Sequence, residues 1–334
     1  MIEEKKSSPK SLLPGDKRPI PAGHSTGGRL EAVLRSGGFA VTAEMAPPDS
    51  ADPQDVYDRA AMFDGVVDAI NATDGSGANC HMSSMGVCSL LTRKGYAMVM
   101  QISCRDRNRI AIQGDVLGAS SMNVANILCL SGDGIKTGDH PEAKAVFDLD
   151  SMTLLKVIRR MRDKSQFMSG RKITKAPDVF IGAAANPFAE PLDYRPHRLA
   201  KKVVAGAQFV QTQYCFDMPI FKDYMKRVVD LGLAEKVFVL AGVGTMVSAA
   251  SATWIRHNIP GINIPNHIIK RLKDSKNPKH EGQEICIEIM QQLKEIEGVS
   301  GIHLMAYRQE STVKDMVLKS GILDGRKPWR PSYN

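Results

Sequence analysis

The chain has 334 residues, of which 43% are hydrophobic and 24% are charged, a composition that excludes a wholly disordered chain. Its net charge of +8 comes from basic residues spread along the sequence, whereas a nucleic-acid surface usually concentrates such charge in one patch. No apolar run approaches the ~18 residues of a membrane span, and no apolar leader segment begins the chain. We therefore expect a cytoplasmic protein that binds neither nucleic acid nor membrane.

Residues 1–27 are rich in Lys, Ser, Pro and Gly, which predicts a flexible N-terminal extension ahead of one domain over residues 28–334. Within that domain, short runs of small and branched apolar residues alternate with longer amphipathic stretches. The runs are nearly continuous, as in parallel strands that are covered on both faces. There are eight of them, at residues 39–45, 67–73, 97–104, 126–133, 179–186, 209–216, 237–243 and 301–307.

Four of the intervening stretches carry apolar residues at helical spacing and predict helices over residues 151–164, 219–231, 265–273 and 283–296. Eight strand-then-helix units with no internal linker indicate an α/β chain that forms a single (β/α)8 TIM barrel. The six cysteines show no CxxC spacing and the eight histidines no HxH or HExxH spacing. Neither a disulfide framework nor a metal site is therefore predicted.

Polar side chains follow or interrupt the apolar runs near their carboxyl ends, where barrel enzymes hold their active sites. A buried carboxylate or amide is costly unless it is paired or used, so the set as a whole favours function. Any single member could equally be a cap or a structural hydrogen bond. The set consists of Glu44, Thr73, Asp74, Gln101, Asp133, Asn186, Gln213 and Arg308.

Glu44 ends the first run and is followed by Pro47 and Pro48, which stop the strand and fix a loop. A partly desolvated carboxyl group there would have a raised pKa and could act as a general acid, although it could also anchor the loop. Asp133 lies between two glycines, Gly132 and Gly134. Glycine lets the backbone approach a ligand closely, but this triplet is also a common turn.

Lys201 and Lys202 lie in the stretch before the sixth run, where they could reach a phosphate or face solvent. Gln213 and Tyr214 end the sixth run. An amide beside an aromatic ring can bind the edge of a flat heterocycle and cover its face, or can simply pack in the barrel. His303 lies inside the eighth run and is expected to be a core residue. The positive charge would attract an anionic cofactor or substrate.

Taken in order, these motifs resemble the methylenetetrahydrofolate reductases, flavin-containing barrel enzymes of one-carbon metabolism. The resemblance extends from about residue 38 to about residue 323. It is carried by Glu44 with Pro47-Pro48, Asn71-Ala-Thr-Asp74, Leu130-Ser-Gly-Asp133, Ala184-Ala-Asn-Pro187, the segment 199–207, Thr212-Gln-Tyr-Cys-Phe-Asp217, the segment 260–265 and Gly301-Ile-His-Leu-Met305.

The resemblance implies an oxidoreductase that interconverts 5,10-methylenetetrahydrofolate and 5-methyltetrahydrofolate by hydride transfer through FAD, with NADH or NADPH as the usual reductant. Glu44 corresponds to the general acid that opens the imidazolidine ring, and Asp133 to an aspartate near the flavin and the pterin. The implied cofactor-binding residues are Thr73, Gln101, Ser131, Gly132, Ala184, Asn186, Lys201 and Lys202. The implied substrate-binding residues are Gln213, Tyr214 and Arg308.

Two positions depart from the well-known bacterial members, which carry histidine in place of Gln101 and often arginine in place of Ser131. The sequence therefore resembles a divergent bacterial-type branch of the family. Two other interpretations stay open. One is a methyltransferase-type barrel that binds folate without flavin, and the other is a partner subunit without turnover, against which the presence of both Glu44 and Asp133 argues. The sequence leaves homo-oligomerisation open.

Overall fold

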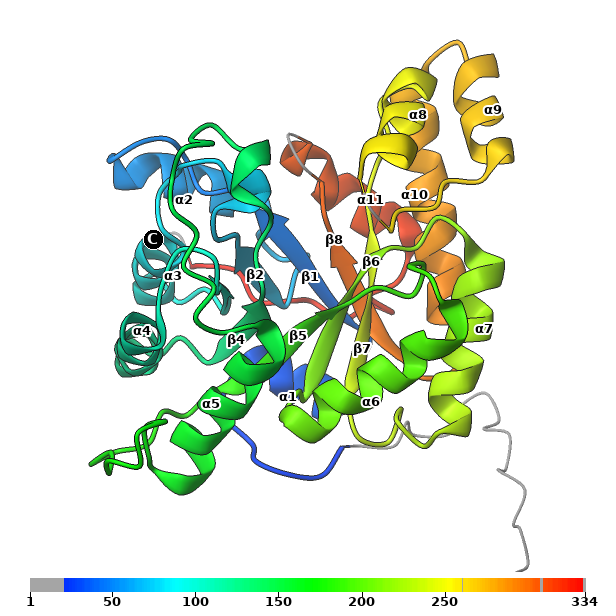
Figure 1. The fold of residues 1–334 in the computed structure, drawn as a ribbon. Coiled ribbons are helices and arrows are strands. Elements are labelled where there is room, and N and C mark those ends of the chain that lie inside the picture. The colour runs from blue at the N-terminus through cyan, green and yellow to red at the C-terminus, as the bar shows by residue number, and fades with distance from the viewer. Residues whose placement is uncertain (1–20, 260, 307–308, 333–334) are drawn as a thin grey trace, which may run out of the picture.

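The computed structural model describes residues 21–259, 261–306 and 309–332, and within them eight parallel strands close into one barrel in sequence order (Figure 1). This confirms the predicted (β/α)8 fold. Each strand overlaps one of the predicted runs, and the last begins two residues earlier than predicted. The strands are β1 (Ala40–Met45), β2 (Ala69–Ala72), β3 (Met98–Ser103), β4 (Asn126–Leu130), β5 (Phe180–Ala185), β6 (Phe209–Tyr214), β7 (Phe238–Val243) and β8 (Val299–Leu304).

Helices surround the barrel and alternate with its strands (Figure 1). The predicted helix 151–164 is observed with the same bounds, and the other three predicted helices are observed with ends shifted by one to five residues. In the described part of the chain the helices are α1 (Arg29–Arg35), α2 (Pro53–Ala61), α3 (Ser84–Arg93), α4 (Arg109–Ser121), α5 (Ser151–Lys164), α6 (Arg195–Ala205), α7 (Met218–Asp230), α8 (Ala249–Asn258), α9 (Asn266–Asp274), α10 (Pro278–Lys294) and α11 (Val313–Ser320).

Side-chain caps explain where several of these helices begin. The Asp150 carboxylate accepts a hydrogen bond from the Thr153 N–H at the start of α5, and the Asn108 side chain caps α4 in the same way. Asp217 caps α7, which then continues with proline in its first turn. Such caps satisfy N–H groups that have no partner inside the helix. The caps of α4 and α7 lie shortly after the ends of β3 and β6, so they also direct the chain away from the carboxyl ends of these strands.

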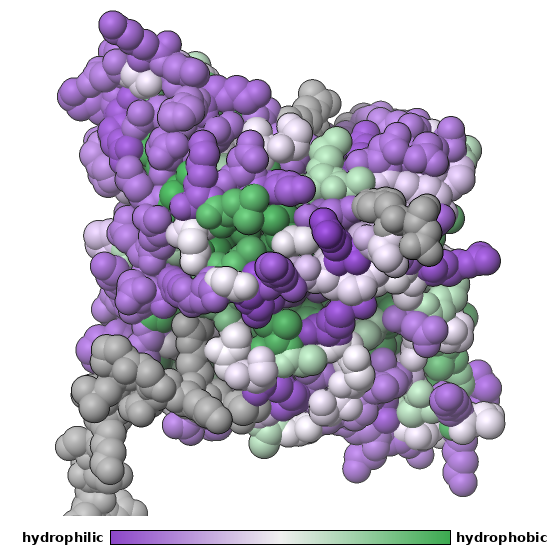
Figure 2. All heavy atoms as spheres, turned by 180° about the vertical axis from the view of Figure 1, so that it is seen from behind, coloured by the Kyte–Doolittle hydropathy of each residue, from purple (hydrophilic) through white to green (hydrophobic). Residues whose placement is uncertain are grey.

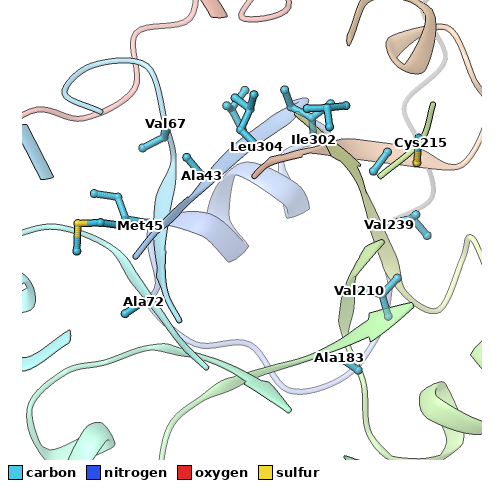
Figure 3. Close-up of a cluster of buried hydrophobic side chains, with 14 of the residues drawn as sticks. Ala43, Met45, Val67, Ala72, Ala183, Val210, Cys215, Val239, Ile302 and Leu304 are labelled. Atoms are coloured by element: carbon cyan, nitrogen blue, oxygen red, sulfur yellow. The ribbon is translucent and has the colours of Figure 1, made fainter. Parts of the chain in front are cut away.

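The larger part of the hydrophobic core lies between the barrel and its helices. Side chains such as Met45, Val239 and Leu304 point outward from the ring of strands (Figure 3) and are fully buried against the helices. Because both faces of each strand are covered, the strands appear in the sequence as continuous apolar runs. The side of the molecule turned away from Figure 1 is largely hydrophilic around a central apolar area (Figure 2).

The amino end of the barrel is closed by apolar side chains. Leu30 and Leu34, one turn apart on α1, are buried there with Phe180, Phe209 and Phe238 from three neighbouring strands. Phe180 and Phe209 stack with ring centroids 4.9 Å apart. The interior is therefore a packed core at this end, and the ligand-binding space lies at the carboxyl end.

Residues 21–27, which the sequence analysis assigned to the extension, contact the barrel. The Arg35 guanidinium donates hydrogen bonds to the Pro21 and His24 carbonyl oxygens, and Gln208 Nε2 also donates to His24 O. The carboxylate of the fully buried Glu31 accepts hydrogen bonds from the Thr26 N–H and hydroxyl. Side chains of α1 and of the residue before β6 therefore hold this segment.

Candidate active site

Two cavities open at the carboxyl end of the barrel, and Glu44 lines both of them. Cavity 1, of about 450 Å³, extends from Glu44 across the ends of β3–β6 to α6. Cavity 2, of about 830 Å³, lies beside the loops that follow β1 and β2. A carboxyl group shared by two cavities can act on ligands in either one.

Strand β1 places the Glu44 carboxylate at this boundary, and two side chains hold it there. Gln101 Nε2, from β3, donates a hydrogen bond of 2.9 Å to Glu44 Oε1. The same oxygen lies 3.8 Å from His303 Nε2, on the neighbouring strand β8. The Glu44 side chain is 29% exposed, so it remains accessible from the cavities.

Burial is the largest single influence on the pKa of Glu44 and raises it. The contact with His303 and the hydrogen bond from Gln101 act in the opposite direction, and together they bring the pKa below its usual value. The prediction of a raised pKa is therefore wrong. The prediction considered desolvation alone, because the sequence does not show which strands bring partners to the carboxylate.

A layer of hydrogen-bonded polar side chains fills the barrel interior next to Glu44. Asn71 Nδ2 donates to Gln211 Oε1 over 2.7 Å, and Gln211 Nε2 donates to the Thr42 hydroxyl. The Thr42 hydroxyl in turn lies 2.9 Å from His303 Nδ1. All four side chains are at most 3% exposed. His303 is thus the buried residue that the sequence predicted, but it also lines cavity 1 and approaches Glu44.

Helix α6 presents three cationic side chains to cavity 1: Arg195, Arg198 and Lys202. They are three and four residues apart and therefore share one face of the helix. Lys202 is buried and donates a hydrogen bond to the Ala184 carbonyl oxygen at the end of β5. Burial, aided by the nearby Arg198 charge, lowers the pKa of Lys202 to about 8. This helix face makes cavity 1 attractive to anions.

Asp133 lies at the same end of the barrel as Glu44 but is exposed and lines neither cavity. Its Oδ2 accepts a hydrogen bond of 2.9 Å from the Gly77 N–H, in the loop after β2. Asp139 makes a similar link, because both of its carboxylate oxygens accept from the Cys80 N–H. We call these two joined loops, residues 75–81 and 132–139, the loop clasp.

Close packing requires glycine at two positions of the loop clasp. A Cβ atom on Gly138 would lie 1.9 Å from the Ala78 carbonyl oxygen, and Gly132 has a φ of +94° with Ser103 directly beside it. Ala78 itself has a φ of 62°, which is rare for a residue with a side chain. Gly138, which the sequence did not single out, thus allows one loop of the clasp to approach the other. Gly132, which the sequence did single out, packs against the segment after β3, and Gly134 has no heavy atom within 4 Å of its Cβ position.

The structure brings most of the predicted site residues together. Glu44, Gln101, Ser131, Ala184, Asn186, Lys202 and Gln213 line cavity 1, and Glu44 and Thr73 line cavity 2. Four others line neither cavity: Asp133 and Gly132 in the loop clasp, Lys201, and Tyr214. The exposed Lys201 donates to the Tyr194 hydroxyl, whereas the Tyr214 hydroxyl donates to the Met305 carbonyl oxygen. Arg308 lies outside the described residues.

The sequence did not single out Arg195 and Arg198, which line cavity 1. Nor did it predict that His303, which also lines this cavity, lies beside Glu44. The spacing of Arg195, Arg198 and Lys202 was a usable signal, since it places three cations on one helix face. In the described part of the chain we find no group of three or more His, Cys, Asp or Glu side chains arranged to hold a metal ion. Nor do residues 21–259, 261–306 and 309–332 contain a helix with the length and apolar character of a membrane span.

The arrangement can bind an anionic group in cavity 1 and exchange a proton at Glu44. Amide and hydroxyl groups from Gln101, Ser131, Asn186, Thr212 and Gln213 supply hydrogen-bonding groups to cavity 1 around that carboxylate. A cavity with a few polar groups at a barrel mouth is typical of a small-molecule enzyme site.

Comparison with known proteins identifies the family. The family model for methylenetetrahydrofolate reductase matches residues 29–321. Methylenetetrahydrofolate reductase 1 of Schizosaccharomyces pombe is 25% identical over 291 residues, which are 83% of this chain and 45% of that protein. A probable methylenetetrahydrofolate reductase (NADPH) of Caenorhabditis elegans is 24% identical over 261 residues, covering 74% of this chain and 36% of that protein. The matched segments thus span less than half the length of these relatives.

Among solved structures, an uncharacterized protein from Clostridium thermocellum that binds two copies of 5-methyl-5,6,7,8-tetrahydrofolic acid has a similar fold, with a TM-score of 0.61. The similarity covers 88% of this chain and 99% of that one at 11% sequence identity, so it supports the fold alone.

Proposed function

Because the chain belongs to the methylenetetrahydrofolate reductase family, we propose that it interconverts 5,10-methylenetetrahydrofolate and 5-methyltetrahydrofolate by hydride transfer through FAD. The observation that carries the proposal is the position of Glu44, a carboxyl group on the boundary between an anion-attracting cavity and a second, larger cavity. The C. elegans relative is named for NADPH, which supports NAD(P)H as the reductant. The six cysteines are free thiols, which fits a cytoplasmic location.

The residues of cavity 1 fit the chemistry of FAD. Arg195, Arg198 and Lys202 bring positive charge that complements a diphosphate. The Arg195 guanidinium already donates hydrogen bonds to the Ala189 and Glu190 carbonyl oxygens, so Arg198 is the arginine proposed to contact the diphosphate with two donors. Gln101, Ser131, Ala184, Asn186 and Lys202 are the proposed cofactor-binding residues that line this cavity. Bound FAD would accept hydride in its oxidised form and donate hydride in its reduced form.

Glu44 is proposed to exchange the proton that accompanies opening and closing of the imidazolidine ring. Its lowered pKa favours the carboxylate. A ligand that excludes water from the mouth strengthens the effect of burial, which raises the pKa, so substrate binding drives proton uptake by Glu44. Gln101 and His303 then hold the carboxyl group in position through the contacts described above.

Asp133 and Gln213 complete the proposed site for the folate. Gln213 lines cavity 1 with its amide oxygen accepting from the Tyr214 N–H, which leaves its amide N–H groups for a ligand. Asp133 would act electrostatically by stabilising positive charge on the folate. Its hydrogen bond to Gly77 fixes the orientation of the carboxylate.

Glu44→Gln tests this proposal because it preserves shape and removes the exchangeable proton. We expect the rate of folate reduction to fall by about 10²–10⁴-fold, the range for loss of a general acid, while reduction of the flavin by NAD(P)H stays close to that of the wild type. Stopped-flow absorbance of each half-reaction measures both rates. Glu235→Gln, an exposed carboxylate between α7 and β7, is the matched control. Equal loss of both half-reactions would contradict the role of Glu44.

A further inference from the structure

Helix α4 lies on the outside of the barrel between α3 and α5, yet its exposed residues are uncharged (Figure 1). The whole of α4 belongs to the described chain, and these residues are Ile110, Ala111, Gly114 and Ser121. The neighbouring α5 shows the usual pattern of an outer helix, because each of its exposed residues is charged: Lys156, Arg159, Arg160, Asp163 and Lys164. A helix that is apolar on its outer as well as its inner face is expected to be covered.

A groove of about 450 Å³ lies between α4 and the turn formed by residues 166–171. Its apolar lining consists of Ile110, Gly114, Leu117, Phe167 and Met168. The buried Gln113 side chain joins the two walls, because its Nε2 donates to the Arg109 carbonyl oxygen and its Oε1 accepts from the Met168 N–H over 2.7 Å. The groove is therefore preformed. We call this groove, together with the four exposed residues of α4, the α4 face.

The two charged residues of α4 are neutralised within the chain. The Arg109 guanidinium donates two hydrogen bonds of 2.7 Å to the Asp148 carboxylate, which lies before the helix. Asp115 Oδ2 accepts a hydrogen bond of 3.1 Å from Arg107 Nη1. Arg171, the other charged residue that lines the groove, is exposed. The α4 face therefore presents apolar groups and internally paired charges, with one arginine beside them.

This charge pattern suits contact with a second copy of the chain. The net charge of +8 makes two copies repel each other wherever their unpaired cations meet. In a two-fold interface, a group near the axis lies opposite its own copy, so an unpaired charge there would face an identical charge. The α4 face avoids this repulsion. A partner of opposite charge would instead be matched by unpaired charges on this face, because charged partners are complementary across their interface.

We propose that the α4 face forms the interface of a two-fold homodimer in which α4 packs against α4 of the second copy. Gly114, in the middle of α4, has no heavy atom within 4 Å of its Cβ position, so another helix can approach closely there. Ile110, which is 78% exposed, and Leu117 lie one turn to either side of Gly114 on the same face. In an antiparallel pair of α4 helices, Ile110 of each copy enters the groove of the other. This inference does not depend on the proposed reaction.

The test is sedimentation equilibrium of the full chain and of two variants that place a charge on the α4 face. Ile110→Glu adds a carboxylate in the first turn of α4, where the helix dipole favours negative charge. Gly114→Arg fills open space with a better helix former, so the fold of each copy is not strained. Val204→Glu is the matched control, because Val204 is 75% exposed on α6, away from the α4 face.

We expect the wild type to sediment as a dimer at micromolar concentrations, and both variants to dimerise about 100-fold more weakly, because like charges then meet across the interface. Val204→Glu should dimerise as the wild type does. Circular dichroism checks that every variant is folded. A wild type that stays monomeric overturns the inference and leaves the α4 face to a different protein. A folded Ile110→Glu or Gly114→Arg variant that dimerises as tightly as the wild type also overturns it, since the copies would then meet elsewhere.

Discussion

The charge of Glu44 depends on His303, its neighbour on β8. Burial by itself would raise the pKa of the carboxyl group, and the contact with His303 is the main reason that the pKa is lowered instead. His303 in turn is fixed through the Thr42 hydroxyl to the buried Asn71–Gln211 pair. The acid–base behaviour of the site is therefore set by residues that lie inside the barrel.

Replacing His303 should change the pH dependence of folate reduction. In His303→Gln the influence that lowers the pKa of Glu44 is weakened and burial prevails, so the pKa rises. A general acid works in its protonated form, so the loss of kcat/KM as pH increases should begin at higher pH than in the wild type. The pH profile of kcat/KM measures this shift, with the exposed His280→Gln as control. A profile that does not move would show that His303 does not control Glu44.

Lys202 gives the cofactor site a pH dependence of its own. Its pKa of about 8 means that the ammonium, and with it the attraction for a diphosphate, is lost as pH rises through 8. We expect FAD affinity to fall over that range in the wild type, to fall far less in Lys202→Arg, and to be about 10–100-fold lower than that of the wild type at pH 7 in Lys202→Met. Fluorescence titration with FAD between pH 6 and pH 10 measures all three. Identical pH profiles for wild type and Lys202→Arg would contradict the role of Lys202.

At the scale of elements, the loop clasp joins the ends of β2 and β4 across β3. Its two loops approach so closely that Gly138 has no room for a side chain. Cys80, the exposed cysteine among six, lies in the clasp and reports on it, because the other five are buried.

Gly138→Ala should therefore loosen the clasp. The added Cβ would meet the Ala78 carbonyl oxygen at 1.9 Å, so the loops must move apart at a cost of about 1–3 kcal/mol. We expect faster alkylation of Cys80 by iodoacetamide and a lower melting temperature. Gly134→Ala is the matched control, since it lies in the same loop at a φ of −67° with no heavy atom within 4 Å of its Cβ. Equal alkylation rates in the two variants would argue against a tight clasp.

The elements themselves were largely predictable because their signals are local. The apolar runs follow from strands buried on both faces, and α5 follows from helical spacing together with the Asp150 cap. The orientation of side chains was harder to predict. Lys201 and Lys202 are adjacent in the sequence, yet only Lys202 turns toward cavity 1, because the packing of α6 on the barrel decides which face is inward. The orientation of the Asp133 side chain was equally hard to predict, because its hydrogen-bond partner Gly77 lies in another loop.

At the scale of the whole molecule, the barrel is packed at its amino end and open at its carboxyl end. Helix α1 and the phenylalanines of β5, β6 and β7 form the closed end. The segment after α11 adds to it, since the Arg326 guanidinium binds the Asp68 carboxylate and Trp329 packs beside Gly95 and Tyr96. The sequence predicted these residues only as apolar members of a core. It did not predict their contacts, because these contacts join residues that lie far apart along the chain.

The proposed reaction requires that one protein holds both a flavin and a folate at the barrel mouth and passes hydride between them. The most direct measurement is an anaerobic titration of the purified, FAD-loaded protein with 5-methyltetrahydrofolate, followed by flavin absorbance. The proposed reaction predicts that the yellow colour of oxidised flavin bleaches as the folate is added. A protein that binds the folate but leaves the flavin oxidised, or that takes up no FAD at all, would contradict it and favour a methyl-transferring barrel.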